Sequence, residues 1–217
     1  GFDVTALCFE GPLEELTKTE KCQPALFTTS LAAFAAFLRR APASLQPVGG
    51  AGLSLGELTA LAAAKAFSLE DGFYLIKARG EAMAACAVQS KGAMLALIGL
   101  PADEVEAVCR ESGAWGANYN TPEQVVLSGA VEAIEKAEVL AKARGAKRAI
   151  RLEVAGAFHS PLMQPAADAF KAALAKVELR APVFPVISNA AAKPTQDPLQ
   201  IRELLVKQIV SPVRWEP

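Results

Sequence analysis

Apolar residues in the first ninety positions recur at the three- and four-residue spacing of amphipathic helices. This spacing predicts helices over 27–40 and 69–87, and Ser68 is placed to cap the second. A turn and a short helix are predicted over 11–16, because Pro12 suits an early helical position. The first part of the chain is therefore expected to be mainly helical.

Between positions 89 and 154 the pattern changes to short apolar runs that alternate with helical segments. The predicted elements are a strand over 93–98, a helix over 102–112, strands over 114–119 and 124–128, a helix over 131–144 and a strand over 148–154. This β-α-β-β-α-β order is typical of a ferredoxin-like unit. We therefore predict that residues 89–154 form a subdomain inserted into an α/β chain.

The remaining segments belong to the part of the chain that surrounds this insert. A small-residue segment over 46–51 is a candidate strand, although its two glycines weaken a strand interior. An alanine-rich helix is predicted over 57–66. Further on, the pattern predicts a helix over 163–177, a buried strand over 183–188 and a final helix over 198–210.

The candidate strand and the alanine-rich helix flank the sequence Gly52-Leu53-Ser54-Leu55-Gly56. The spacing G-x-S-x-G is that of a nucleophile elbow, in which glycines relieve the crowding around a strained serine between a strand and a helix. The turn would expose the Ser54 hydroxyl and direct the Leu55 amide toward the oxygen of a bound acyl group. Because glycine and serine are common residues, a plain glycine-containing turn remains the alternative.

A serine nucleophile requires a base, and His159 is the only histidine of the chain. A neutral imidazole within hydrogen-bond reach of Ser54 would accept its proton during attack and return a proton to the leaving group. No carboxylate can be identified as its partner, but a backbone carbonyl could hold the other ring nitrogen. The alternative is a surface or capping histidine.

Arg79 and a later basic stretch could each bind an acidic group, or could simply be exposed to solvent. Arg79 lies on a helix with an otherwise apolar stripe, where its planar guanidinium could pair with a substrate carboxylate. Spacing alone favours a solvent-facing arginine instead. The densest basic stretch could dock an acidic partner, although such runs are more often solvated. That stretch contains Lys142, Arg144, Lys147, Arg148 and Arg151.

Composition narrows the class of protein. The 217 residues suffice for one sizeable domain with an insert, and the net charge of −1 argues against a nucleic-acid partner. No apolar run approaches the ~18 residues of a membrane span. A single histidine and scattered cysteines make a metal site improbable, and predict reduced, mostly buried thiols in a cytoplasmic protein. The cysteines are Cys8, Cys22, Cys86 and Cys109.

Several motifs occur together, in one order, along nearly the whole chain. They are Gly11-Pro12-Leu13-Glu14-Glu15-Leu16, Gln23-Pro24-Ala25-Leu26, Gly52-Leu53-Ser54-Leu55-Gly56-Glu57, Arg79-Gly80, Asn118-Tyr119-Asn120-Thr121-Pro122-Glu123-Gln124-Val125-Val126, Phe158-His159-Ser160-Pro161-Leu162-Met163 and Ser211-Pro212-Val213-Arg214-Trp215. In this combination the chain resembles the malonyl-CoA:acyl-carrier-protein transacylases of fatty-acid synthesis, and the related acyltransferase domains of polyketide synthases. The combination is far more specific than any one motif.

The resemblance implies roles for the matching residues. Ser54 would be the acylated nucleophile, His159 its base and the Leu55 amide one oxyanion donor. Arg79 would bind the free carboxylate of the malonyl group. Three further residues would lie near the substrate, and the last of them would help to exclude an α-methyl group. These residues are Gln23, Asn120 and Phe158.

The resemblance also implies the reaction and the fold. Malonyl would pass from malonyl-CoA to Ser54 and then to the phosphopantetheine thiol of acyl carrier protein, in a ping-pong mechanism without a metal or a resident cofactor. The implied fold is an α/β-hydrolase-like core with a parallel sheet, made of 1–88 and 155–217, and an inserted ferredoxin-like subdomain over 89–154. We expect a monomer with no nucleic-acid or membrane partner.

Three departures from the family pattern stand out. Leu53 replaces the histidine that usually precedes the nucleophile. The family opens with a strand and a G-Q-G-S-Q loop, whose first glutamine supplies a second oxyanion donor, and this chain begins after that point. The family also continues beyond the S-P-V-x-W motif, where a backbone carbonyl usually orients the histidine, whereas this chain stops at Pro217. We therefore expect a chain that lacks both family termini.

Other functions remain open from the sequence. A polyketide-type or malonate-decarboxylase-type acyltransferase would carry the same motifs. A serine thioesterase or esterase would use the same elbow without needing Arg79. A truncated, non-catalytic module that docks a carrier protein would retain the fold, but Ser54 would not be acylated.

Overall fold

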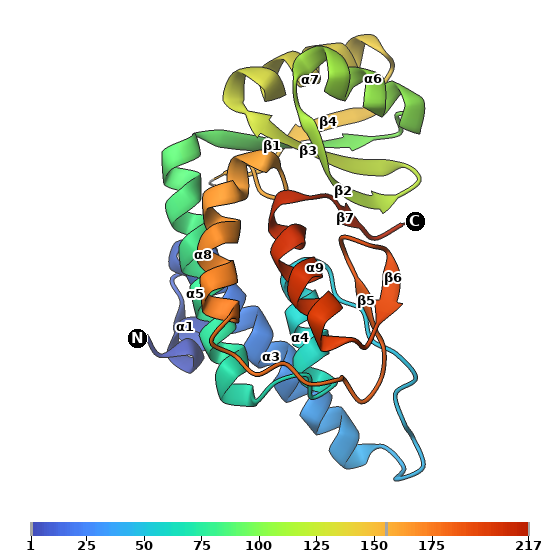
Figure 1. The fold of residues 1–217 in the computed structure, drawn as a ribbon. Helices are drawn as coiled ribbons and strands as arrows, with labels where there is room; N and C mark the ends of the chain where they lie inside the picture. The colour runs from blue at the N-terminus through green and yellow to red at the C-terminus, as the bar shows by residue number, and fades with distance from the viewer. Residues whose placement is uncertain (1, 155, 217) are drawn as a thin grey trace.

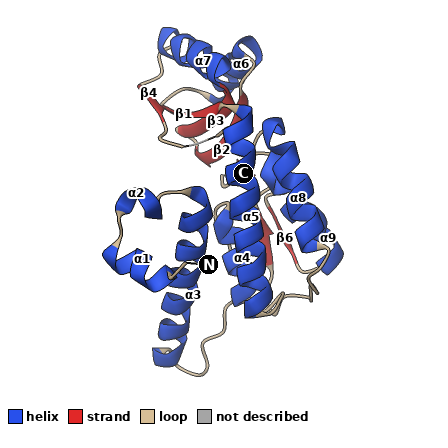
Figure 2. Cartoon of the chain, turned by 90° about the vertical axis from the view of Figure 1, so that its left-hand side faces the viewer, coloured by secondary structure: helices blue, strands red, loops and turns tan. Residues whose placement is uncertain are grey.

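The computed structural model describes residues 2–154 and 156–216 and has a mixed α/β fold. A β-sheet covered on its outer face by two helices lies at one end of the molecule, and a largely helical body lies at the other (Figure 1). Figure 2 shows the same division from the side, with α6 and α7 above the sheet and α3, α4 and α5 in the body below. The two parts correspond to the change in sequence pattern near position 89.

The first ninety residues are mainly helical, as the apolar spacing predicts. The helices are α1 (Val4–Glu10), α2 (Leu13–Leu16), α3 (Thr19–Arg40), α4 (Leu55–Ala63) and α5 (Leu69–Ser90). Ser68 caps α5 by accepting the amide of Asp71 at 3.0 Å. Helix α3 begins eight residues earlier than predicted and contains Pro24. Its first turns pack closely on α5, and this tertiary contact outweighs the hydrogen bond that the proline removes.

The sheet end contains the six predicted elements in their predicted order. They are β1 (Gly92–Ile98), α6 (Ala102–Ser112), β2 (Trp115–Thr121), β3 (Gln124–Ala130), α7 (Val131–Ala143) and β4 (Arg148–Arg151). The strand order is β4-β1-β3-β2-β7, where β7 (Val213–Arg214) adds in parallel to β2 and the other pairs are antiparallel. Residues near the end of the chain thus add an edge strand to this sheet.

Side chains of this sheet alternate between two apolar layers, because successive strand residues point to opposite faces. Leu95, Leu97 and Leu127 pack under α6 and α7. Met94 and Val126 face the other way, toward the loop that carries the histidine. This face of the sheet therefore packs against the loop that carries His159.

The body is completed by a 3₁₀ turn over Pro161–Met163, α8 (Gln164–Leu174), β5 (Val186–Ser188), β6 (Lys193–Thr195) and α9 (Pro198–Val210). The predicted strand over 46–51 is reduced to one parallel bridge between Gly50 and Val186, while β5 pairs antiparallel with β6. In the described part of the body, the predicted parallel sheet is thus limited to that bridge. Pro47 lacks an amide donor and Gly49 adds no side chain to pack, which weakens strand pairing there.

Two other expectations can be compared with the structure. The four cysteines are free thiols, but the prediction that they are mostly buried is wrong, because only Cys86 is buried. No helix within 2–154 and 156–216 has the length and apolar character needed to cross a bilayer. The predicted domain limits Gly1, Ala155 and Pro217 lie outside the described residues.

Candidate active site

The elbow places Ser54 on a strained turn directly before α4. Its backbone angles are φ 52° and ψ −105°, a conformation that L residues seldom adopt. A Cβ on Gly52 would lie 2.0 Å from the carbonyl carbon and oxygen of Gly56, so position 52 admits no side chain. The expectation that Gly56 also relieves crowding is wrong, because a Cβ there would meet nothing within 4 Å.

Asn189, just after β5, braces this turn from the other side. Its Oδ1 accepts the amide of Ser54 at 2.5 Å, and its Nδ2 donates to the carbonyl of Gly52 at 2.8 Å. One buried amide thus supports the chain on both sides of the serine. The role of Asn189 could not be predicted from the sequence, since an asparagine after a short strand has no distinctive pattern.

The structure brings Ser54 and His159 together although 105 positions separate them. The distance between Ser54 Oγ and His159 Nε2 is 2.8 Å, and the imidazole is buried. His159 Nδ1 lies 2.8 Å from the carbonyl oxygen of Gln208. Because a carbonyl only accepts, the proton belongs on Nδ1, which leaves Nε2 free to accept the serine proton. The surface-histidine alternative is therefore wrong.

The protonation state of His159 fits this role. Burial, and to a lesser extent the nearby Arg79 cation, lower its pKa to about 4, although the hydrogen bond to the Gln208 carbonyl opposes this shift. Below this pKa the ring would carry a charge and could no longer accept a proton. At neutral pH the imidazole is uncharged, as a general base must be before it acts.

The carbonyl that orients His159 belongs to Gln208, near the end of α9. It can accept from the imidazole because it accepts no amide of its own helix. In a continuing helix the carbonyl of Gln208 would accept the amide of residue 212, but Pro212 has no amide hydrogen. Helix α9 ends at Val210, and Ser211 is extended. The expectation that the orienting carbonyl lies beyond the end of this chain is therefore wrong. The S-P-V motif was the available signal, since it places a proline four residues after Gln208.

Arg79 is buried against Ser54, so the interpretation as a solvent-facing arginine is wrong. Its Nη2 donates to Ser54 Oγ at 2.9 Å and to Gln208 Oε1 at 2.9 Å, and its Nη1 donates to Gln23 Oε1 at 2.7 Å. Its Nε is buried without a partner among the described residues. Burial lowers the pKa of Arg79 to about 10, and Glu57 partly opposes that shift, so the guanidinium is charged at neutral pH.

Gln23 reaches Arg79 because helices α3 and α5 approach each other closely. A Cβ on Gly80 would lie 3.1 Å from the Cα of Glu20 and 3.4 Å from the carbonyl oxygen of Thr19. The glycine after Arg79 thus permits the contact that sets Gln23 in place. Gln23 is buried, as its predicted position near the site requires.

The other predicted residues are placed with less direct contacts. Leu55 is the first residue of α4, where a backbone amide has no acceptor within the helix. Phe158 packs between the body core and the open face of the sheet. Asn120 donates to Gln124 at 3.4 Å, and in the described chain it bonds to none of Ser54, His159 and Arg79. Its Oδ1 is buried without a partner there.

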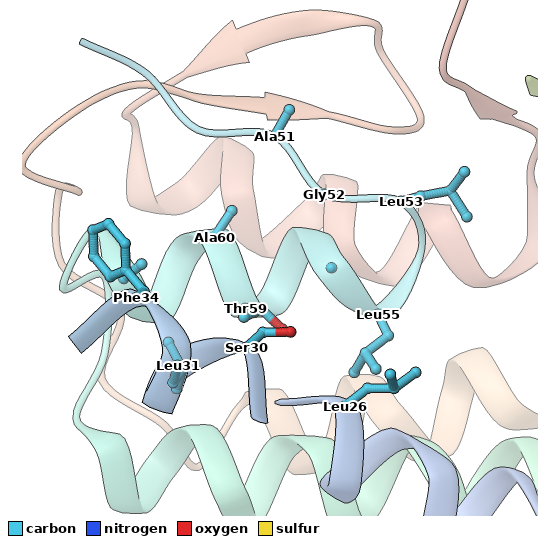
Figure 3. Close-up of a pocket in the computed structure, with 12 residues that line it drawn as sticks. Leu26, Ser30, Leu31, Phe34, Ala51, Gly52, Leu53, Leu55, Thr59 and Ala60 are labelled. Atoms are coloured by element: carbon cyan, nitrogen blue, oxygen red, sulfur yellow. The ribbon is translucent and has the colours of Figure 1, made fainter. Parts of the chain in front are cut away.

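A groove of about 380 Å³ adjoins the elbow between α3 and α4. In Figure 3 the side chains of Leu26 and Leu55 point toward each other at one end of this groove, and Phe34 closes the other end. Neither Ser54 nor His159 lines it. The groove therefore borders the back of the turn rather than the reacting atoms.

Three of the five residues of the basic stretch pair with carboxylates on α6 and α7. Arg144 pairs with Glu104 at 3.0 Å and with Glu111 at 2.7 Å. Lys142 and Arg151 both pair with Glu138. No group of three His, Cys, Asp or Glu side chains in the described chain is arranged to hold a metal ion.

A serine on a strained turn, a neutral buried imidazole oriented by a carbonyl and an amide at a helix N-terminus form a site suited to acyl transfer through a serine ester. The class that the fold and the site fit is thus an acyl-transfer enzyme. The chain belongs to the acyl transferase domain family, whose model matches residues 1–217.

Named relatives and solved structures agree with that family. The malonyl CoA-acyl carrier protein transacylase of Bacillus subtilis is 43% identical over 218 residues, covering 98% of this chain and 68% of the relative. A crystal structure of an acyl carrier protein S-malonyltransferase from Vibrio cholerae has a TM-score of 0.94 and 39% identity, covering 99% of this chain and 71% of that one. A type II PKS acyl-carrier protein in complex with its malonyl-transacylase matches with a TM-score of 0.94 and 38% identity, covering 99% and 70%.

Proposed function

We propose that this chain transfers a malonyl group from malonyl-CoA to the phosphopantetheine thiol of acyl carrier protein, in fatty-acid synthesis. The observation that carries the choice of acyl group is the Arg79 guanidinium, buried 2.9 Å from the nucleophilic oxygen of Ser54. A buried cation at this position favours an acyl group that brings its own carboxylate. A neutral acyl group would leave the charge without a partner, which disfavours an esterase of neutral acyl groups.

In the first half-reaction the substrate carboxylate binds Arg79 and replaces Ser54 Oγ as a hydrogen-bond partner of Nη2. The freed hydroxyl attacks the thioester carbonyl while His159 Nε2 accepts its proton. The Leu55 amide donates to the oxyanion of the tetrahedral intermediate. The carbon–sulfur bond then breaks, the proton passes from His159 to the sulfur, and coenzyme A leaves a malonyl ester on Ser54.

In the second half-reaction the thiol of the carrier protein's phosphopantetheine takes the place of coenzyme A. His159 accepts the thiol proton as the sulfur attacks the ester carbonyl, and it returns a proton to Ser54 Oγ when the ester bond breaks. Both half-reactions use the same residues, because the second is chemically the reverse of the first. The acyl group moves from a thiol to Ser54 Oγ in the first and from Ser54 Oγ to a thiol in the second. The cycle needs no metal or resident cofactor, since coenzyme A enters only as part of the substrate.

The roles of the remaining residues follow from their contacts. Gln23 would hold the Nη1 edge of Arg79, and Phe158 would limit the space beside the acyl chain. Asn120, whose Oδ1 is buried without a partner in the described chain, would donate or accept a bond once substrate is bound.

The experiment that tests this function separates the two half-reactions. The protein is acylated with malonyl-CoA, freed of coenzyme A, and mixed with holo or apo acyl carrier protein. The expected result is that malonyl leaves the enzyme and appears on the holo carrier alone. Hydrolysis of the ester to free malonate at the same rate with either carrier would indicate a thioesterase instead.

A further inference from the structure

Glu57 is a buried acid to which the proposed reaction assigns no task. It lies in the first turn of α4, three residues after Ser54, and is 2% exposed. Its Oε2 accepts the backbone amide of Asn189 at 3.0 Å and the Nε2 of Gln208 at 2.7 Å. Both donors are uncharged. A buried carboxylate without a cation beside it is costly, so its retention suggests a more distant partner charge.

Arg79 is a buried cation that contacts no negatively charged group among the described residues. It is 1% exposed, and its three hydrogen-bond acceptors, on Gln23, Ser54 and Gln208, are all uncharged. A cation removed from water requires a negative charge nearby or a strong polar environment. Before a substrate carboxylate arrives, its direct contacts supply only neutral dipoles.

The side chain of Gln208 joins these two groups. Its Nε2 donates to Glu57 at 2.7 Å and to the carbonyl of Ser54 at 2.9 Å, while its Oε1 accepts from Arg79 at 2.9 Å. The amide dipole thus has its positive end toward the carboxylate and its negative end toward the guanidinium. Through this oriented amide, the Glu57 carboxylate and the Arg79 guanidinium are coupled electrostatically although they do not touch.

We propose that Glu57 is the resident counter-charge of Arg79 and that, through Gln208, it limits how tightly Arg79 binds the substrate carboxylate. This inference rests on the proposed malonyl transfer and makes Glu57 a positioning residue rather than a catalytic one. A direct ion pair would occupy the guanidinium and exclude the substrate, whereas a separated one leaves Nη2 free to exchange Ser54 Oγ for an incoming carboxylate. The separation therefore lets one cation be stabilised in the empty site and still be available to the substrate.

The test removes the charge while keeping the hydrogen bonds. In Glu57→Gln, the new amide oxygen can accept from Asn189 and Gln208, so the network is preserved and only the charge is lost. Two quantities are measured: the ratio of the second-order rates of Ser54 acylation by malonyl-CoA and acetyl-CoA, and the inhibition constant of free malonate. The proposal predicts that the rate ratio rises about tenfold and that malonate inhibits about tenfold more tightly, because Arg79 has lost its competing negative charge.

The double variant Glu57→Gln with Gln208→Glu supplies the opposite perturbation. It moves the same charge from position 57 to position 208, directly beside Arg79. Here the rate ratio is expected to fall at least tenfold and malonate inhibition to weaken, because the guanidinium now has a contacting carboxylate. If the single variant does not fold, the double variant still tests the proposal, because an unchanged rate ratio would show that a carboxylate in this network does not weaken the binding of malonyl by Arg79 and would overturn it.

Thermal unfolding of each variant establishes that folded protein is compared. An equal fall of both acylation rates, with an unchanged ratio, would show that Glu57 only supports the fold and would overturn the proposal. A wild type that is never malonylated on Ser54 would instead overturn the proposed function, so the two failures are distinguishable.

Discussion

Replacing Arg79 by methionine isolates the contribution of its charge to the choice of acyl group. The linear methionine side chain fills part of the same buried space but has no guanidinium. Arg79→Met therefore removes the partner of the malonyl carboxylate, while the hydrogen bonds between Ser54, His159 and the Gln208 carbonyl stay in place. We expect the serine to remain reactive toward acyl groups that carry no charge.

The size of the effect follows from the burial of the pair. Truncating one partner of a buried, hydrogen-bonded charge pair costs about 2–5 kcal/mol in binding. Arg79 is 1% exposed, so we place its loss near the middle of this range, at about 3 kcal/mol. Because about 1.4 kcal/mol corresponds to a tenfold change, the acylation efficiency with malonyl-CoA should fall by about two orders of magnitude.

The assay compares stopped-time acylation of Ser54 by malonyl-CoA and by acetyl-CoA at equal concentrations. In Arg79→Met, the malonyl rate should fall about a hundredfold relative to the acetyl rate. The matched control is Arg40→Met, at an exposed helix end, which should leave the ratio as in the wild type. Equal losses with both thioesters in Arg79→Met would refute the assignment of this residue to the substrate carboxylate.

Three other predictions follow from the geometry. Because burial lowers the pKa of His159 to about 4, the acylation rate should stay level from about pH 8 to about pH 5 and fall only as the pH approaches 4. Pro212→Ala supplies an amide that competes for the Gln208 carbonyl, so the maximal rate should fall about tenfold with a smaller change in KM. Gly52→Ala should destabilise the fold by about 3 kcal/mol, because its Cβ would lie 2.0 Å from the backbone of Gly56, whereas Gly56→Ala should be neutral or stabilise α4 by up to about 1 kcal/mol.

Each of these predictions has a control. The pH profile is read beside the free energy of unfolding, which should itself fall as the pH drops from 6.5 toward 4, because the unfolded histidine binds its proton first. A midpoint of activity near 6.5 would contradict the burial argument. Pro198→Ala, at the other end of α9, is the control for Pro212→Ala, and equal rates in the two would exclude a role for the freed carbonyl. The glycine pair is compared by denaturant unfolding, and equal midpoints would contradict the steric account.

The sequence predicted the elements of this chain better than their pairing. The helix over 198–210 and the helix over 102–112 have the predicted bounds, because apolar periodicity and end signals agree there. The strand over 46–51 was expected from its place before the elbow, yet only Gly50 forms a bridge. Strand pairing depends on a partner that is distant in sequence, so local pattern alone could not decide it.

Some residues of the site could likewise be predicted from the sequence, and others could not. Ser54 and His159 could be predicted because a motif and a unique residue type identify them. Arg79 was the harder case, because its helical spacing fits solvent and core equally well, and only the packing of α3 and α9 shows its burial. Gln208 and Asn189 were missed, since their roles arise from contacts across more than a hundred positions.

Whether Ser54 carries a malonyl group during the reaction can be read from the mass of the intact protein. Wild-type protein and Ser54→Ala are incubated briefly with malonyl-CoA or with acetyl-CoA, and the modified peptide is mapped. We expect one malonyl adduct, located on Ser54 of the wild type, little acetyl adduct, and none on the variant. A folded sample that gains no adduct, or one that gains it equally in Ser54→Ala, would contradict the account.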